Sequence, residues 1–339
     1  MAVSDIPLDP RSITVERAPE IAEPPRRRRA RRIVLIVLAV LLALSTVPAY
    51  LAWSAWSGWR SVERVELSDL LQGSASGTNY LIVGTDSREG INADTVNAGL
   101  ILGEGTAGAR TDTIAVLRVD DVGVSLLAIP RDLWVEIPGG KTNRINAAFA
   151  FGGGRDLVQT VQNQLGIGLD HYLEIDLAGF LGLVDALGSV TVDFPYPAFD
   201  TRSGLNVAQS GPVELDGPTA LAYVRSRRYT EHINGEEITD PTSDLGRVQR
   251  QQRFLRGLMA ELGGTRNPFT LLDALDAVAA NVKVDDGLSI TEAARLGLRI
   301  RGAEPITATV PTTRYITPGG ADVLVFTPES EQVLEAFRG

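Results

Sequence analysis

The feature that most constrains the fold is a long stretch without a charged residue between Arg32 and Arg60. It opens with an unbroken apolar run at 33–44 and stays largely apolar to Trp53. About 20 helical residues, each rising about 1.5 Å, cross a hydrocarbon core of about 30 Å. The sequence therefore predicts a transmembrane helix at residues 33–53.

The charges that flank this run predict its orientation. Arginines crowd the positions just before it, at 26–32, and basic residues mark the cytoplasmic side of membrane helices. We therefore expect a single-pass protein of the cell membrane with a cytoplasmic N-terminus and an extracellular domain. A cleaved signal peptide is the alternative, but the run and the tail before it are long, and residues 48–52 make a poor cleavage site.

Composition narrows the kind of protein further. The chain has 339 residues, no cysteine and a formal net charge of −10, although residues 1–32 carry eight arginines against five acidic residues. The absence of cysteine excludes a disulfide scaffold. Because the rest of the chain is strongly acidic, it would repel nucleic acid, and we expect no nucleic-acid partner.

Four segments follow from these patterns. Residues 1–32 are rich in proline and charge, so they form a disordered basic tail in the cytoplasm. The membrane helix at 33–53 leads into a juxtamembrane stalk at 54–78, which ends in a Gly/Ser-rich stretch. A single extracellular folded domain then occupies residues 79–339, within the size expected of one domain.

Three short apolar runs in the first half of this domain predict buried strands, at residues 80–83, 113–119 and 123–129. Charged residues stand at the ends of these strands, namely Asp86 and Arg88 after the first, Arg110 and Asp112 before the second, and Arg131 and Asp132 after the third. In an open α/β sheet such ends converge on one edge, where ligands bind. Residues scattered in the sequence could therefore meet there.

The rest of the domain shows mainly helical patterns. Strands are predicted at 171–175, 190–194 and 307–311, and helices at 146–151, 154–165, 177–187, 218–225, 244–262, 268–280, 291–301 and 328–337. Arg225 and Arg227 would point to different sides of a continuing helix, so a helix that serves one ligand with both should end near Arg225. On the next helix, Asp244, Arg247 and Gln251 share one stripe.

Arginine and aspartate in these short motifs indicate a chemistry. The arginine fork is always charged and matches phosphate oxygens two at a time. Aspartate commonly anchors a divalent cation that neutralises phosphate. Asp86 and Asp112 alone would fit ordinary turn and cap residues, but the surrounding arginines favour a pyrophosphate and metal site. The sequence contains no Ser-His-Asp arrangement, nucleotide-binding Gly-Lys loop or zinc-type cluster.

Seven short blocks follow one another in the order NYLIVGTDSR (79–88), RTDT (110–113), SLLAIPRD (125–132), INAA (145–148), VDALG (184–188), LDGPTALAYVRSR (215–227) and DLGRVQRQ (244–251). Each block alone is weakly specific. In this order and behind one anchor, they make residues 79–337 resemble the LytR-CpsA-Psr family of bacterial envelope proteins.

The resemblance implies a three-layer-like α/β domain with a central mixed β-sheet flanked by helices, preceded by one N-terminal transmembrane helix. It also implies an enzyme, a phosphotransferase that moves a glycopolymer from a polyprenyl-pyrophosphate carrier to peptidoglycan and forms a phosphodiester link. The expected partners are the carrier-linked glycopolymer, peptidoglycan and the membrane.

By the same resemblance, the charged residues receive roles. Asp86 and Asp112 would hold Mg²⁺ (or Mn²⁺) on the pyrophosphate, and Gln251 would orient a phosphate oxygen. Asp244 would either hold a neighbouring arginine or take the proton from the acceptor hydroxyl. The remaining residues would clamp the pyrophosphate, with Arg88 and Arg110 binding substrate and Arg131, Arg225, Arg227 and Arg247 acting in catalysis.

Two other functions stay open at this point. A pyrophosphatase or phosphodiesterase would use the same site with water as the acceptor. A non-catalytic anchored module would bind an envelope polymer and would tolerate loss of the aspartates, which an enzyme should not.

Further expectations concern the surroundings of this site. The carrier lipid needs an apolar groove, which Leu157, Val161, Phe180, Leu183, Val184 and Leu187 could line, although such stripes more often form core. Arg228 and Arg250 break the spacing and are interpreted as solvated. His171 is interpreted as a hydrogen-bonded structural residue, and His232 as part of a polar loop at 229–240.

Overall fold

The computed structural model describes residues 26–87, 111–242 and 244–338, and the chain divides into two compact units at 1–50 and 51–339. Helix α1 (Arg26–Ser61) contains the whole stretch predicted to cross the membrane, together with the last part of the predicted tail. Among the described residues, no helix has the length and apolar content that a membrane crossing requires. The transmembrane helix at 33–53 therefore stays a prediction.

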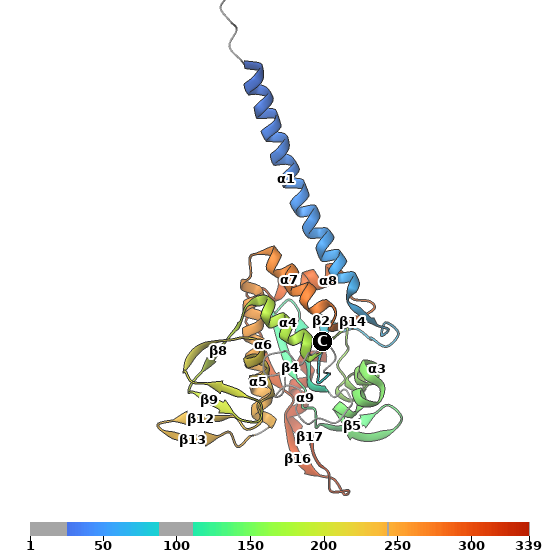
Figure 1. Ribbon diagram of the computed structural model, residues 1–339. Coiled ribbons are helices and arrows are strands. Elements are labelled where there is room, and N and C mark those ends of the chain that lie inside the picture. The colour runs from blue at the N-terminus through green and yellow to red at the C-terminus, as the bar shows by residue number, and fades with distance from the viewer. Residues whose placement is uncertain (1–25, 88–110, 243, 339) are drawn as a thin grey trace, which may run out of the picture. The chain divides into compact units, whose positions relative to one another are not determined.

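A mixed sheet forms the centre of the unit at 51–339 (Figure 1). Within the described ranges it has seven strands in the order β1-β14-β7-β2-β3-β4-β15. Their bounds are β1 Glu63–Val65, β14 Val282–Asp285, β7 His171–Ile175, β2 Thr78–Thr85, β3 Thr111–Val119, β4 Val124–Ala128 and β15 Ile306–Thr309. The predicted central mixed sheet is thus confirmed.

The pairing directions bring the predicted strand ends to one edge of this sheet. β2 is parallel to β7 and antiparallel to β3, and β3 is antiparallel to β4. The C-terminal ends of β2, β7 and β4 therefore lie at the same edge as the N-terminal end of β3. The register pairs Gly84 with Thr113 and Thr85 with Thr111, so Asp112 is the extra residue of a β-bulge. Bulges often re-aim side chains beside active sites.

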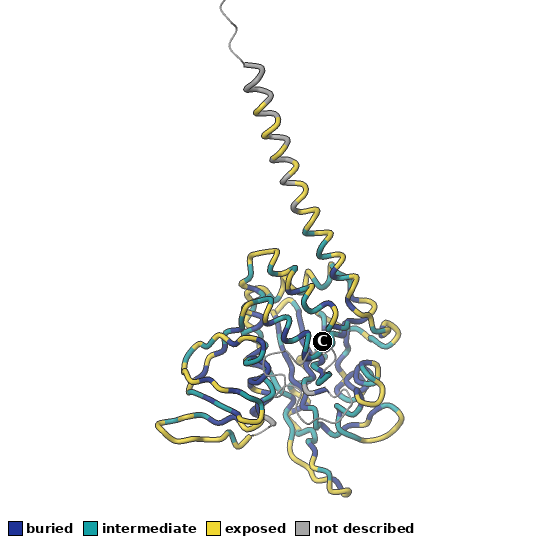
Figure 2. The backbone as a smooth tube through the Cα atoms, in the orientation of Figure 1, coloured by how far each residue is buried: buried dark blue, intermediate teal, exposed yellow. Residues whose placement is uncertain are grey.

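Helices cover both faces of the sheet. Alternate residues of β2 point to opposite sides of the sheet, so this one strand contributes side chains to the cores on both faces. Leu81 and Val83 join one core with residues of α3 (Ile145–Leu165) and α9 (Pro328–Arg338). Tyr80 and Ile82 join the opposite core, with residues of α6 (Asp244–Gly264), α7 (Pro268–Ala279) and α8 (Ile290–Ile300). Figure 2 shows the buried positions along the sheet and the inner sides of the helices. Each fully buried aliphatic side chain stabilises the fold by about 1.5–3 kcal/mol.

A further core lies beside the sheet and supports the helices that carry the arginines. It joins α4 (Leu177–Leu187), α5 (Gly217–Arg225) and part of α6 to the antiparallel pair of β8 (Val190–Phe194) and β11 (Gly211–Leu215). Next to it lies a small sheet whose strands follow the order β10-β9-β12-β13. The remaining strands are β9 Ala198–Asp200, β10 Leu205–Val207, β12 Thr230–Ile233, β13 Glu236–Thr239, β5 Trp134–Ile137, β6 Lys141–Arg144, β16 Thr312–Ile316 and β17 Asp322–Phe326.

Several predicted elements are confirmed in detail. The strands at 171–175 and 190–194 and the helix at 177–187 have the predicted bounds. Two helices were expected around residue 153, and α3 is indeed interrupted by non-helical backbone at Gly152 and Gly153. α5 ends at Arg225, as one shared ligand requires, and begins where the Asp216 carboxylate accepts the N–H of Thr219.

Two segments differ from their predictions. Part of the predicted stalk belongs to the folded domain, since β1 joins the sheet and Leu67 is fully buried. The predicted polar loop at 229–240 is the hairpin β12–β13. Its turn has Asn234 at φ 52° and Gly235 at φ 88°, the positive angles that an Asn-Gly hairpin turn requires.

The two histidines have structural surroundings. Nδ1 of His171 lies 3.3 Å from Oδ2 of the fully buried Asp285, which confirms the expected hydrogen-bonded role. Burial acts to lower the pKa of His171, but the bond and charge of Asp285 outweigh it and the pKa is raised. His232 lies in β12, where its ring stacks on Phe199 with 5.0 Å between centroids.

Candidate active site

A pocket opens at the edge of the sheet where β2 and β7 end. Its charged and amide-bearing lining comes from Asp86, Asp176, Arg225, Arg247 and Gln251. Its apolar lining comes from Ile82, Ile175, Leu177, Phe180, Leu221, Val224, Phe254 and Leu255. Its cavity volume is about 110 Å³, or about 770 Å³ when the open space at its mouth is included. Such a lining suits a ligand with an apolar tail and a charged head.

Arg247 is the common element of this site. It stands on α6 and is only 2% exposed. It lines the apolar pocket with Arg225, a second pocket with Arg131 and Gln251, and a third with Arg227. A guanidinium held this deep is strongly shielded from water, so its attraction for an anion is much stronger than at the surface.

Asp86 and Arg225 meet at the mouth of the apolar pocket. Asp86 follows β2 and Arg225 ends α5, and their Oδ1 and Nη2 atoms are 3.9 Å apart. Gln251 ties α6 to the same helix end, because its Nε2 donates to the carbonyl of Val224 at 3.3 Å. The end of α5 is thus fixed beside the stripe of α6 that carries Arg247.

Arg131 approaches the cluster from the end of β4. Its Nε forms an ion pair with Oδ2 of the neighbouring Asp132, at 3.5 Å. Asp132 also forms an ion pair with Arg144, with 3.1 Å between Oδ1 and Nε. Arg131 therefore stands between the pocket it shares with Arg247 and an open groove on the side of Arg144.

Asp200 shapes the turn that carries Arg227. It ends β9 and is 1% exposed. Its Oδ2 accepts the hydroxyl of Ser226 at 2.7 Å and the backbone N–H groups of Arg227 and Arg228 at 3.0 and 2.8 Å. Burial acts to raise the pKa of Asp200, but these bonds and those from the N–H groups of residues 202 and 203 outweigh it, so the pKa is lowered. Asp200 belongs to none of the sequence motifs and was therefore not predicted.

Arg250 contradicts its prediction, since it is 3% exposed rather than solvated. Nη1 donates to Asp240 and Nη2 to the carbonyl of Ser226, both at 2.8 Å. Its guanidinium also lies over the ring of Tyr229, 4.6 Å from the centroid. The same Asp240 carboxylate explains the glycine at 246, where a Cβ atom would overlap it. Arg250 therefore connects the turn at residues 226–228 to Asp240 and Tyr229.

Asp200→Asn should lower the free energy of unfolding at neutral pH by about 2–4 kcal/mol, because the new amide group would face N–H donors. The carboxylate has a lowered pKa in the folded state, so its stabilisation is complete above the ordinary value of 3.8 and is lost as the pH falls through the folded value. The deficit of the variant should therefore shrink at acid pH. Urea unfolding of the full chain in detergent, at neutral and acid pH, measures this, with the exposed Asp193→Asn as control. A deficit that did not change with pH would contradict it.

The other predicted residues have different outcomes. Arg88 and Arg110 lie outside the described residues, as do the side chains of Asp112 and Asp244, although the backbone places these two in β3 and α6. Arg227 and Arg228 are exposed, as expected for Arg228.

The predicted lipid groove is largely wrong. Phe180 does line the apolar pocket. Leu157 and Val161, in contrast, are fully buried in the core under α3, and Leu183, Val184 and Leu187 pack in the core beside the sheet. Only a helix stripe could be recognised in the sequence, and α3 and most of α4 use theirs for packing.

The residue types at this edge of the sheet are compatible with a magnesium ion. Among the side chains that the structure describes, no three His, Cys, Asp or Glu residues gather into a metal site. Magnesium, however, needs only one or two carboxylates when phosphate oxygens and water complete its shell. Asp86 follows β2 directly, and the bulge puts the backbone of Asp112 opposite that strand end. The donor set therefore fits a cation that arrives with a pyrophosphate.

Comparison with known proteins gives consistent results. The model of the LytR_cpsA_psr family matches residues 59–336. A probable cell wall biosynthesis protein LcpB of Corynebacterium glutamicum is 36% identical over 259 residues, which are 75% of this chain and 59% of that protein. A polyisoprenyl-teichoic acid–peptidoglycan teichoic acid transferase TagU of Enterococcus faecalis is 33% identical over 201 residues, 57% of this chain and 60% of that protein. The chain thus spans about three fifths of these curated relatives.

Solved structures agree with the fold. A LytR-Csp2A-Psr enzyme from Actinomyces oris superposes with a TM-score of 0.64 at 26% sequence identity. The match covers 81% of this chain and 95% of that one. The central mixed sheet and its flanking helices are therefore shared with an enzyme of known structure.

Proposed function

Because the chain belongs to the LytR-CpsA-Psr family, we propose that it is a phosphotransferase that moves a glycopolymer from a polyprenyl-pyrophosphate carrier to peptidoglycan. The observation that carries this proposal is a single pocket in which an apolar lining runs up to Arg225 and Arg247. A polyprenyl pyrophosphate has the matching chemistry, an apolar chain that ends in two phosphates. The TagU relatives, named as polyisoprenyl-teichoic acid–peptidoglycan teichoic acid transferases, support the transfer to peptidoglycan.

The proposed reaction exchanges one bond to phosphorus for another. A hydroxyl of a peptidoglycan sugar attacks the phosphorus that carries the glycopolymer, and a new P–O bond forms. The bond from that phosphorus to the bridging oxygen breaks, and polyprenyl monophosphate leaves with the electron pair. The hydroxyl proton passes to a base, for which Asp244 on α6 is the candidate. The product is a phosphodiester between polymer and peptidoglycan.

The arginines stabilise charge during this exchange. Phosphoryl transfer is catalysed mainly by positioning and by charges aimed at the transferring and leaving oxygens. Arg247 is the deepest of the described arginines at the site, and Arg131, Arg225 and Arg227 reach the same region from two other segments, the end of β4 and the end of α5 with the turn after it. We assign these four to the pyrophosphate, and Gln251 to its orientation. Arg88 and Arg110 would add to the same clamp.

Asp86 and Asp112 are assigned to a divalent cation, Mg²⁺ or Mn²⁺. When bound, the ion would neutralise part of the negative charge on the pyrophosphate. Asp86 also lies 3.9 Å from Arg225, so it can orient that guanidinium. The chain would work at the outer face of the cell membrane, anchored by the predicted helix at 33–53 with its N-terminus in the cytoplasm. A water molecule in place of the sugar hydroxyl would make the same site a pyrophosphatase.

A transfer assay tests this proposal. Full-length protein in detergent is given a polyprenyl-pyrophosphate glycopolymer with a labelled sugar, Mg²⁺ and peptidoglycan. We expect the label to become attached to peptidoglycan through a phosphodiester, with one polyprenyl monophosphate released for each transfer. Release without attachment would support the hydrolase instead, and binding without any release would support a non-catalytic module.

A further inference from the structure

We infer that the open groove beyond Arg131 holds the acceptor, an uncharged glycan rich in hydroxyl and N-acetyl groups; this inference rests on the proposed function. The groove has a volume of about 570 Å³, within the range of small-ligand sites. Its described lining consists of Arg131, Asp132, Asn143, Arg144, Asn146, Ala147, Ala150 and Asp322. Part of it comes from the INAA block at 145–148, which the pyrophosphate site does not use.

The groove continues directly from the arginine cluster. Arg131 lines both the groove and the pocket that it shares with Arg247 and Gln251. The backbone N–H of Asn146 donates to the carbonyl of Arg131 at 3.2 Å, so these two residues are fixed next to each other. A sugar in the groove would therefore have a hydroxyl within reach of a phosphate held by Arg131.

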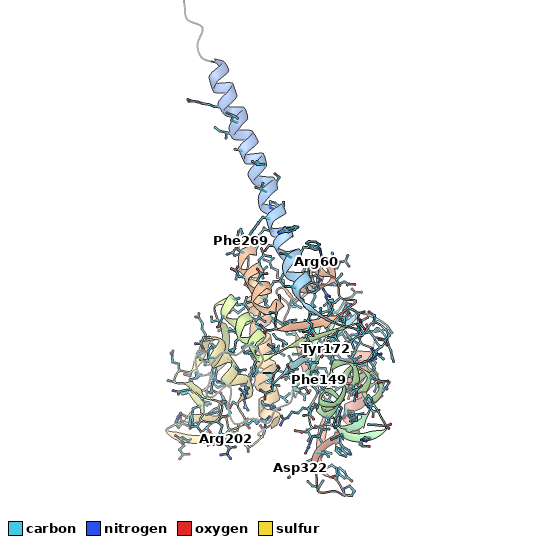
Figure 3. The ribbon with its side chains drawn as sticks, turned by 45° about the vertical axis from the view of Figure 1, so that its right-hand side comes forward. Arg60, Phe149, Tyr172, Arg202, Phe269 and Asp322 are labelled. Carbon is cyan, nitrogen blue, oxygen red and sulfur yellow. The ribbon has the colours of Figure 1, made fainter. Side chains whose placement is uncertain are left out.

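The groove differs in net charge from the polar pocket on the other side of the arginine cluster. That pocket, which Arg247 shares with Arg227, is lined by Arg202, Arg225, Arg227, Arg228 and Arg247 against Asp86 and Asp200, among the described residues, and is strongly positive. In the groove, two arginines are balanced by two aspartates. Figure 3 shows Arg202 and Asp322 on opposite sides of the same end of the domain. An anionic, phosphate-linked donor polymer fits the positive pocket, and an uncharged glycan fits the neutral groove.

Fixed walls and available amides make the groove suitable for sugars. Arg144 joins its two sides, through the ion pair with Asp132 and a bond from Nη2 to the carbonyl of Asp322 at 3.0 Å. Asn143 uses Oδ1 to accept the N–H of Arg144, which leaves its NH₂ as a donor. Within the described parts of the chain, the half-buried side chain of Asn146 forms no hydrogen bond. It can offer both a donor and an acceptor to a glycan.

The decisive substitution is Asn146→Ala in the full chain, assayed with a soluble peptidoglycan fragment as acceptor. We expect the KM for the fragment to rise about five-fold, which corresponds to one lost neutral hydrogen bond. The KM for the donor and the release of polyprenyl phosphate to water should not change. Ala147→Phe, which fills the groove, should reduce transfer by at least about ten-fold and leave that release intact. Asn163→Ala, at an exposed position of the same helix, is the matched control.

The alternative outcomes separate the groove from the reaction. A higher KM for the donor in both groove variants would assign the groove to the donor polymer and overturn the inference, as would unchanged kinetics in both. Calorimetric titration of the fragment into the protein without donor gives a second measurement. If the fragment binds more weakly to Asn146→Ala but the wild type transfers no polymer, the groove is still the glycan site and the proposed reaction is wrong. If neither substitution changes the affinity for the fragment, the groove is not the glycan site.

Discussion

Arg247→Ala should reduce kcat/KM for glycopolymer transfer by about a thousand-fold, the lower end of what an arginine aimed at a transferring phosphoryl group supplies. Arg247 is 2% exposed and borders three pockets of the site, so neither water nor a neighbouring side chain can readily replace its charge. Arg247→Lys should recover only part of the activity, because an ammonium group keeps the charge but loses the two-pronged contact.

The control for this prediction is Arg256→Ala, at an exposed position of the same helix, which should behave like the wild type. Transfer rates are measured at saturating acceptor, and the melting temperature of each variant shows whether it is folded. A folded Arg247→Ala protein with more than about a tenth of the wild-type kcat/KM would remove Arg247 from the catalytic group.

Asp86→Ala should reduce metal-dependent turnover by about a hundred-fold or more, because it removes one of two carboxylates proposed to hold the ion on the pyrophosphate. Binding gives an independent measurement. With inorganic pyrophosphate present, Mg²⁺ should raise the melting temperature of the wild type, since a ligand that binds only the folded state stabilises it. This rise should be much smaller in Asp86→Ala.

The matched control is Asp121→Ala, a fully exposed carboxylate at the far end of β3. It should keep both the turnover and the magnesium-dependent rise. If Asp86→Ala kept the rise but lost turnover, Asp86 would act by orienting Arg225, which lies 3.9 Å away, and the metal assignment would be withdrawn.

The sequence was most informative where local signals and the geometry of a sheet agree. Short apolar runs located β2, β3 and β4, and the convergence of strand ends at one edge of an open α/β sheet predicted that their charged ends would meet. The end of α5 at Arg225 followed from asking how two arginines two residues apart can serve one ligand. These are backbone properties, which depend on neighbouring residues.

What the sequence did not reveal are contacts between distant residues. Asp200 lies 26 residues before Ser226, and no local pattern links the two. Arg250 was assigned to solvent by its helical spacing, whereas Asp240 and Tyr229, which bury it, belong to the hairpin region before α6. The Asn-Gly pair at 234–235 was the signal for that hairpin and was overlooked.

The most direct test of the central claim is a crystal structure of the protein with a polyprenyl pyrophosphate and Mg²⁺. The account predicts the pyrophosphate within hydrogen-bonding distance of Arg247 and Arg225, the cation on Asp86, and the lipid chain along Phe180 and Leu221. A pyrophosphate bound away from Arg247, or a lipid chain outside the apolar pocket, would contradict it.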